Sequence, residues 1–212
     1  MKVAVIALTR KGAELALKIG YCMNADVYVK GEIINKYVIN GKLALVHPFA
    51  IGFGKLMEKV FPLYEGLIFI TACGIVVRSI APYLKSKTED PAVVVVDEMG
   101  RIAISLLSGH LGGANRLAGD VSAITGGIPV ITTATDINNV IAFDVFARDH
   151  DCVIENIGVL KYISAELVNG GSIGLYSDYP LNGILPPNIA RCEAGQKYLL
   201  VVAITNRTDI PV

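Results

Sequence analysis

The stretch at residues 97–115 reads DEMGRIAISLLSGHLGGAN, and it joins a strand, a glycine-rich turn and a helix. An apolar segment over residues 101–107 leads directly into the glycine-rich residues 108–113, and helical spacing begins at Ala114. Such a junction is typical of a ligand-binding site, because glycine allows the backbone to approach a ligand closely. The first turn of the helix adds N–H groups and the positive end of a dipole, which attract an anion.

Strands and helices alternate on both sides of this stretch. Residues 2–8 form an apolar run that predicts a buried strand, Thr9 has the residue type of an N-cap, and residues 11–21 show helical spacing. The β–α–β order predicts an α/β fold with a mostly parallel open sheet and flanking helices. The same patterns predict further strands over residues 26–29, 43–46, 66–71, 92–97 and 128–132, and helices over residues 54–61, 76–84 and 114–125.

The pattern changes beyond Asp136, where strands and helices become shorter and turns more frequent. We therefore expect an N-terminal α/β domain over residues 1–136, followed by a second small α/β unit over residues 137–212. In this second unit the predicted helices cover residues 142–149 and 157–168, and the predicted strands cover residues 172–176 and 198–205.

Three strand ends carry small or polar residues, near Cys73, Gly109 and Thr135. If the sheet is parallel, all three strand ends lie at the same edge and converge on one cleft. The candidates for ligand binding at these strand ends are Cys73, Gly74, Gly109, Gly112, Gly113, Asn115, Thr133, Thr135 and Asp136.

Composition excludes several classes of protein. The net charge is zero at pH 7, which argues against nucleic-acid binding through bulk electrostatics. No run approaches the roughly 20 apolar residues of a membrane span, and a strand pattern follows Met1 so closely that we expect no signal peptide. The four cysteines form no CxxC pair and the three histidines have no ligand spacing, so we expect reduced thiols, no metal site and a cytoplasmic location. GxGxxG and P-loop motifs are absent.

The segment from Phe69 to Asp136 resembles the CbiG family of anaerobic cobalamin biosynthesis. It contains GIVVR, LKSK, DPAVVVVDE, SLLSGHLGGAN and PVITTATD in the order that family members show. The combined string is specific, although no single piece of it is. Weaker similarity on both sides extends the resemblance to the family's N-terminal and middle regions and to most of the chain.

The resemblance implies a cobalt-precorrin-5A hydrolase, which opens a lactone on a cobalt-containing tetrapyrrole and yields cobalt-precorrin-5B and acetaldehyde. Cobalt belongs to that substrate, so we expect no cofactor of the protein's own. Many family members continue into a C-terminal domain, which we expect to be absent here. A separate C-terminal-domain protein and a homodimer are the partners left open. The alternatives are a non-catalytic tetrapyrrole-binding subunit and, ranked last, an α/β module that binds a nucleotide or sugar phosphate.

Hydrolysis of a lactone needs a base, a nucleophile and stabilisation of an oxyanion. His110 is the candidate base, because its ordinary pKa of about 6.5 suits proton transfer near neutrality. The alternative for His110 is a structural role, in which it caps the helix or bonds a carbonyl. Ser108 is a candidate nucleophile, but an activated water is preferred because the sequence lacks the G-x-S-x-G elbow. Asp97 and Glu98 are candidates to orient His110 or to act as the base, with a charged hairpin turn as their structural alternative. Cys73 is a weaker candidate nucleophile.

The implied substrate is rimmed with carboxylates, so its binding requires several anion sites. The predicted helix starts at Gly74 and at residues 112–114 are two candidates. Backbone N–H groups around Gly109 and at residues 112–113 are candidates for an oxyanion hole. The basic residues that could pair with carboxylates are Arg78, Lys85, Lys87, Arg101 and Arg116. The alternative for these cations is a solvated surface role.

Overall fold

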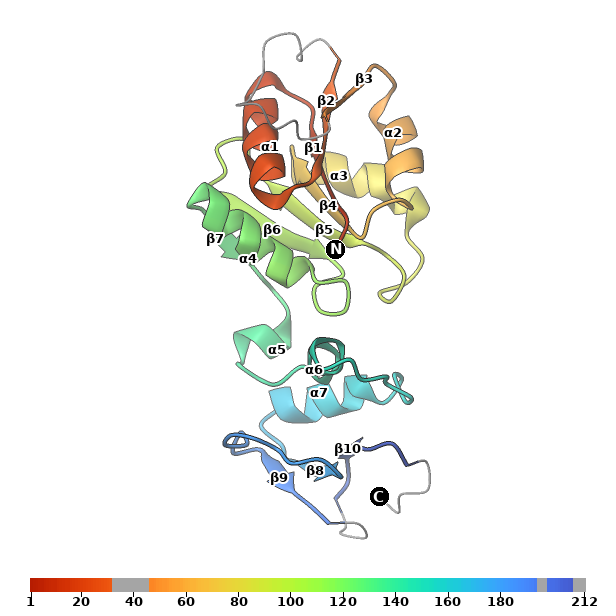
Figure 1. The fold of residues 1–212 in the computed structure, drawn as a ribbon, viewed down its shortest axis with the longest axis vertical. Helices are drawn as coiled ribbons and strands as arrows, with labels where there is room; N and C mark the ends of the chain where they lie inside the picture. Colours follow the sequence, from red (N-terminus) through yellow and green to blue (C-terminus); the bar gives the residue numbers. More distant parts are fainter. Residues whose placement is uncertain (32–45, 194–197, 208–212) are drawn as a thin grey trace. The chain divides into compact units, whose positions relative to one another are not determined.

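The computed structural model describes residues 1–31, 46–193 and 198–207. The chain forms two compact units, Met1–Thr132 and Thr133–Val212 (Figure 1). The change in sequence pattern predicts the boundary after Asp136, a few residues beyond this division. Most of the strand predicted over residues 43–46 lies outside the described residues.

Within its described residues, the first unit is built on a seven-stranded sheet in the order β3-β2-β1-β4-β5-β6-β7. Strands β1 to β5 are mutually parallel, β6 runs antiparallel to β5, and β7 runs parallel to β6. The predicted fold class, an α/β fold with a mostly parallel sheet, is confirmed. The bounds are β1 Val3–Ala7, β2 Asp26–Lys30, β3 Val46–Phe49, β4 Gly66–Ile70, β5 Ala92–Val96, β6 Ile102–Leu107 and β7 Ile128–Val130.

The reversal at β6 follows from the short connection that precedes it. Only residues 97–101 join β5 to β6, whereas a parallel pair requires a crossover of a dozen residues or more. Gly100 adopts a left-handed conformation with φ of 67°. The Asp97 carboxylate accepts hydrogen bonds from Met99 N–H at 2.8 Å and Ile102 N–H at 2.7 Å. The connection is therefore a hairpin turn closed by Asp97.

Helices cover both faces of the sheet (Figure 1). One face packs against α1 (Arg10–Met23) and α4 (Ala114–Thr125), and the other against α2 (Phe53–Val60) and α3 (Cys73–Ile80). A short 3-10 helix, η2 (Ala81–Tyr83), follows α3. The predicted cap of α1 is confirmed, since Thr9 Oγ1 accepts a 3.1 Å hydrogen bond from Gly12 N–H.

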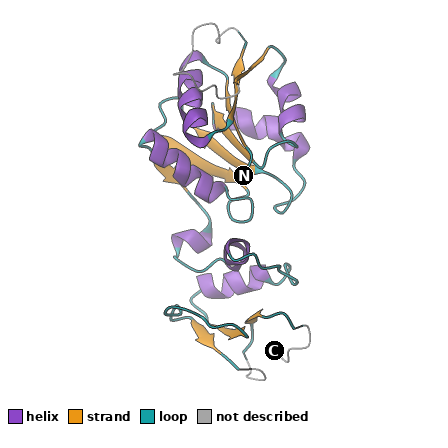
Figure 2. Ribbon diagram, in the orientation of Figure 1, coloured by secondary structure: helices purple, strands orange, loops and turns teal. Residues whose placement is uncertain are grey.

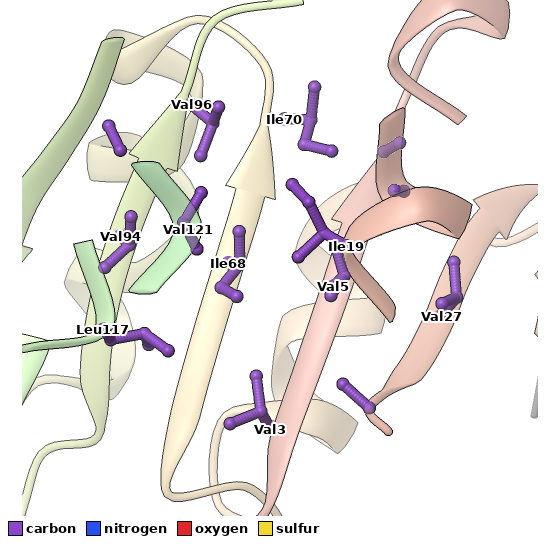
Figure 3. Packing of buried hydrophobic residues seen from close by; sticks show 14 of the residues in the cluster. Val3, Val5, Ile19, Val27, Ile68, Ile70, Val94, Val96, Leu117 and Val121 are labelled. Carbon is purple, nitrogen blue, oxygen red and sulfur yellow. The ribbon is translucent and has the colours of Figure 1, made fainter. Parts of the chain in front are cut away.

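Alternate residues of each buried strand enter the two opposite cores. Val5, Ile68 and Val94 are fully buried on the face of α1 and α4, as Figure 3 shows. Their neighbours Ile6 and Phe69 are buried on the face of α2 and α3. Continuous apolar runs therefore mark strands buried on both faces, as expected for the parallel centre of an α/β sheet.

The second unit contains three helices and a small three-stranded sheet within its described residues (Figure 2). All strand pairs of this sheet are parallel, in the order β10-β8-β9. Its core includes Phe143, Ile163, Leu167 and Ile173. The predicted second small α/β unit is thus confirmed. Its elements are α5 Ala134–Ile137, α6 Phe143–Asp149, α7 Leu160–Val168, β8 Ile173–Ser177, β9 Ile189–Arg191 and β10 Val201–Ile204.

Candidate functional site

Because β6 runs antiparallel to β5, residues that the sequence predicted to share one cleft lie at opposite edges of the sheet. We call the edge at which β1 to β5 begin the amino edge, and the opposite edge the carboxyl edge. Cys73 and Gly74 follow β4 and lie at the carboxyl edge. Residues 108–110 follow the reversed strand β6 and lie at the amino edge. The expected convergence of all three strand ends is therefore wrong, because it assumed a parallel β6.

Asp97, Glu98 and Arg101 belong to the hairpin turn at the carboxyl edge. The five residues of β5 separate this turn from the amino edge by roughly 17 Å. Asp97 cannot therefore orient His110, which corrects the sequence-based pairing of these two residues. The Asp97 carboxylate instead closes the hairpin turn, and Glu98 Oε1 accepts a hydrogen bond from Thr9 Oγ1.

Residues 108–113, which we call the glycine loop, fold against the start of α4. Ser108 O accepts a 3.1 Å hydrogen bond from Ala114 N–H, and Gly109 O accepts a 3.1 Å bond from Asn115 N–H. His110 O accepts a 2.9 Å bond from Gly113 N–H. The first N–H groups of α4 are thus used by the loop itself. The N–H groups of Ala114 and Asn115 are therefore not available to the carboxylate that the sequence predicted at this helix start, around residues 112–114.

Ser108 holds the beginning of the glycine loop in place. Its φ of 57° lies in the left-handed region, which is costly for a residue other than glycine. Its hydroxyl donates a 3.0 Å hydrogen bond to the backbone carbonyl of Asp90. A hydroxyl that donates to a carbonyl is not activated by a base. The geometry therefore favours water over Ser108 as the nucleophile.

Asn115 lies beneath the glycine loop and is only 9% exposed. Its Oδ1 accepts a 2.7 Å hydrogen bond from the Ser105 hydroxyl. A Cβ at Gly109 would lie 2.8 Å from the same oxygen, so only glycine fits above Asn115. Asn115 thus supports the loop from the protein side.

The charged turn at residues 85–90 adjoins the glycine loop through Asp90. Asp90 Oδ1 accepts a 2.9 Å hydrogen bond from Lys85 N–H, and Asp90 O accepts the bond from Ser108. Lys85 and Lys87 are exposed, and Lys85 Nζ lies 3.6 Å from a carboxylate oxygen of Glu89. This turn and the glycine loop form one continuous part of the amino edge.

The other predicted binding residues are distributed over both units. Arg78 is exposed in α3, where its guanidinium donates a 3.3 Å hydrogen bond to Gly74 O. Arg101 and Arg116 are exposed. Thr133, Thr135 and Asp136 belong to the second unit, in which the Thr133 hydroxyl donates to the Asp136 carboxylate at the start of α5. Thr135 is buried.

Asp90 and Ser105 are residues that the sequence-based reading missed. Both hold the glycine loop through hydrogen bonds, Asp90 to Ser108 and Ser105 to Asn115. An acid just before a run of valines was the only local signal for Asp90. The hydrogen-bonding partners of both residues depend on strand pairing, which a single sequence does not reveal.

A second polar network lies at the amino edge near β2 and β3. Tyr64 OH donates a 2.7 Å hydrogen bond to Asp26 Oδ2 and lies 2.8 Å from Tyr28 OH. His47 Nε2 lies 3.6 Å from Asp26 Oδ1, and its ring stacks on Tyr28. Burial raises the pKa of the Tyr64 phenol above its ordinary value, and the hydrogen bonds to Asp26 and Tyr28 raise it further. The network anchors the edge strand β3 to the sheet.

Two further structural properties concern metal binding and membrane insertion. Among the residues that the structure describes, no three histidine, cysteine or acidic side chains are grouped closely enough to hold a metal ion. In the same residues, no helix has the length and apolar character needed to cross a membrane.

The fold resembles that of a crystal structure from Sulfolobus solfataricus, described as a cobalamin biosynthesis protein G homolog. The TM-score is 0.54 at 23% sequence identity, over 95% of this chain and 59% of that one. Two family models match the sequence itself. The cobalamin synthesis G N-terminal model matches residues 55–136, which include the glycine loop, and the cobalamin biosynthesis central region model matches residues 141–211. The chain therefore belongs to the CbiG family and carries its N-terminal and central regions.

Curated relatives are similar over most of this chain. A protein of Priestia megaterium is 38% identical over 176 residues, which is 82% of this chain and 46% of that protein. A protein of Salmonella typhimurium is 37% identical over 192 residues, which is 90% of this chain and 51% of that protein. Both are named cobalt-precorrin-5A hydrolase. The chain spans about half the length of these relatives.

Proposed function

We propose that this chain carries the N-terminal and central regions of a cobalt-precorrin-5A hydrolase. The reaction is the opening of a lactone on a cobalt-containing tetrapyrrole, with formation of cobalt-precorrin-5B and release of acetaldehyde. The observation that carries the proposal is the identity of 37–38% to two relatives of that name over most of the chain.

The glycine loop is the proposed reaction centre. His110 accepts a proton from a water molecule, and that water attacks the lactone carbonyl. Backbone N–H groups near Gly109 and Gly112 stabilise the resulting oxyanion. The bond from Ser108 to Asp90 O supports water, rather than Ser108, as the nucleophile. Collapse of the intermediate breaks the ring C–O bond, and the departing oxygen takes up the proton. Acetaldehyde leaves in a second step, in which this hydroxyl gives up its proton, the C–C bond to the macrocycle breaks, and the electron pair of that bond passes to the tetrapyrrole.

Binding of the substrate is assigned to cations around the same edge. Lys85 and Lys87 are exposed on the turn that adjoins the glycine loop, so they can pair with peripheral carboxylates of the tetrapyrrole. Cobalt arrives within the substrate, and the proposal assigns no cofactor to the protein. It also takes the protein to be cytoplasmic, with no nucleic-acid or membrane partner.

The deciding experiment is an assay for acetaldehyde released from cobalt-precorrin-5A under anaerobic conditions. The chain is assayed alone and together with the remaining half of the Salmonella typhimurium relative, supplied as a separate polypeptide. Release by the chain alone supports a complete catalytic site within these residues. Release only in the mixture supports a shared site and a separate C-terminal-domain partner.

Two results would contradict the hydrolase proposal in different ways. Binding of the cobalt tetrapyrrole without release, even in the mixture, would favour the non-catalytic binding subunit. Neither binding nor release would remove cobalt-precorrin-5A as the substrate.

A further inference from the structure

Asp90 is a buried acid that forms no ion pair in the described part of the chain. It is 9% exposed and lies just before β5, at the end of a charged turn. Burying a carboxylate is costly unless hydrogen bonds compensate for the lost water. Asp90 Oδ1 accepts a 2.9 Å bond from Lys85 N–H, and Asp90 N–H donates a 2.9 Å bond to Ser86 O. Side chain and backbone of Asp90 thus close the turn at residues 85–90.

The backbone of Asp90 also holds the neighbouring glycine loop. Its carbonyl accepts the 3.0 Å hydrogen bond from the Ser108 hydroxyl. Ser108 has the unfavourable φ of 57°, so external contacts must stabilise its conformation. The second such contact is the bond from Ala114 N–H to Ser108 O. Ser108 is therefore fixed between the charged turn and the start of α4.

From these contacts we infer that Asp90 is a positioning residue for the glycine loop. Its carboxylate sets the shape of the turn, the turn sets the place of the Asp90 carbonyl, and the carbonyl fixes Ser108. His110 follows Ser108 by two residues, so the place of its ring depends on this chain of contacts. The same turn carries Lys85 and Lys87. One buried acid thus fixes the spacing between the candidate base and the candidate cations.

The positioning role does not require Asp90 to contact the substrate. The role in turnover rests on the proposed function, whereas the role in holding the loop does not. A displacement of about 1 Å in a catalytic group can lower a rate by about 100-fold. Loss of the Asp90 side chain should therefore reduce kcat more than it changes KM.

The test compares Asp90→Ala, Asp90→Asn and the control Asp120→Asn. Asp120 is an exposed acid in α4, so its variant removes one negative charge away from the turn. Hydrogen–deuterium exchange of residues 108–114 reports on the loop without any substrate. Acetaldehyde release from cobalt-precorrin-5A gives kcat and KM, and the melting temperature shows whether each variant is folded.

In Asp90→Ala, exchange in the loop should rise by roughly 3- to 10-fold, as expected from the loss of one hydrogen bond. Its kcat should fall by about 10- to 100-fold, with KM close to that of the unmodified chain. Asp90→Asn should show loop exchange and kcat close to those of the unmodified chain, because the amide oxygen still accepts a hydrogen bond from Lys85 N–H. Asp120→Asn should behave like the unmodified chain.

Loop exchange in Asp90→Ala equal to that of Asp120→Asn would overturn the inference. Equal losses of kcat in Asp90→Asn and Asp90→Ala would also overturn it, because charge rather than hydrogen bonding would then matter. If Asp90→Ala does not fold, Ser108→Ala removes the other half of the contact and should raise loop exchange in the same way. Absence of acetaldehyde from the unmodified chain would count against the proposed function alone, since loop exchange would still test the positioning role.

Discussion

Thr9 and Glu98 meet at the carboxyl edge of the sheet, where Thr9 Oγ1 donates a 2.5 Å hydrogen bond to Glu98 Oε1. Thr9 follows β1 and Glu98 follows β5, although β4 lies between these two strands. The bond ties the start of α1 to the β5–β6 hairpin turn. It also places Glu98 at the edge opposite the glycine loop.

Replacement of Glu98 by glutamine should therefore leave turnover close to that of the unmodified chain. The length of β5 keeps its carboxylate roughly 17 Å from the glycine loop, which excludes direct proton transfer. Steady-state acetaldehyde release measures the effect, with the melting temperature as a check of folding. A large loss of kcat in a folded Glu98→Gln protein would return Glu98 to the list of catalytic groups.

Local sequence predicts a strand well where the strand is a continuous run of apolar residues, and poorly where it is short. The buried runs at β1, β4 and β5 predicted their strands correctly, because apolar residues continue on both faces of each strand. The strand β9 was missed, since its three residues follow a proline-rich loop and have no distinctive pattern.

The direction of β6 shows where the sequence-based prediction failed. The sequence predicts the turn at Gly100, whereas the antiparallel direction of β6 follows from how short the connection between β5 and β6 is. Because of this reversal, residues 108–110 lie at the edge of the sheet opposite the edge that carries Cys73. The glycine loop itself could be predicted from its residues, whereas its supports at Asp90 and Ser105 come from distant parts of the chain.

Tyr64 offers a test of the network that anchors β3. In Tyr64→Phe the Asp26 carboxylate loses its 2.7 Å donor, so the free energy of unfolding should fall by about 1–2 kcal/mol. Tyr21→Phe is the matched control, because Tyr21 is exposed on α1. Urea unfolding of both variants at neutral pH measures the difference. Equal stability of the two variants would show that the network contributes nothing.

The same tyrosine should give stability a dependence on alkaline pH. The pKa of Tyr64 is raised in the folded state, mainly by burial, so the folded protein retains the phenolic proton more tightly than the unfolded chain. This contribution is complete below the unfolded pKa of about 10 and is lost as pH rises above it. Between neutral and strongly alkaline pH, the unmodified protein should lose stability more steeply than Tyr64→Phe. Parallel pH profiles would contradict this coupling.

Gly112 and Gly119 form a matched pair for testing the glycine loop. A Cβ at Gly112 would lie 2.4 Å from Ser108 Cβ and 2.8 Å from Ser108 O, so Gly112→Ala must displace the loop backbone. We expect a loss of about 1–3 kcal/mol in the free energy of unfolding, and a larger loss for Gly112→Val. A Cβ at Gly119 meets nothing within 4 Å, so Gly119→Ala in α4 should raise stability by up to about 1 kcal/mol. Similar urea midpoints for the two alanine variants would show that the loop tolerates the extra atom.

His110→Ala tests the proposed base directly. Turnover should fall by roughly 100-fold or more, because general-base catalysis contributes that order to a rate. Binding of the cobalt tetrapyrrole should change little, since the cations on the neighbouring turn remain. Added imidazole should restore part of the lost rate if His110 acts through its ring nitrogen, whereas a purely structural histidine would show no such rescue. His110→Gln keeps hydrogen-bonding groups without a comparable base, so it should be as slow as His110→Ala. Normal turnover in either folded variant would exclude His110 from the proton transfer and leave water activation to another group.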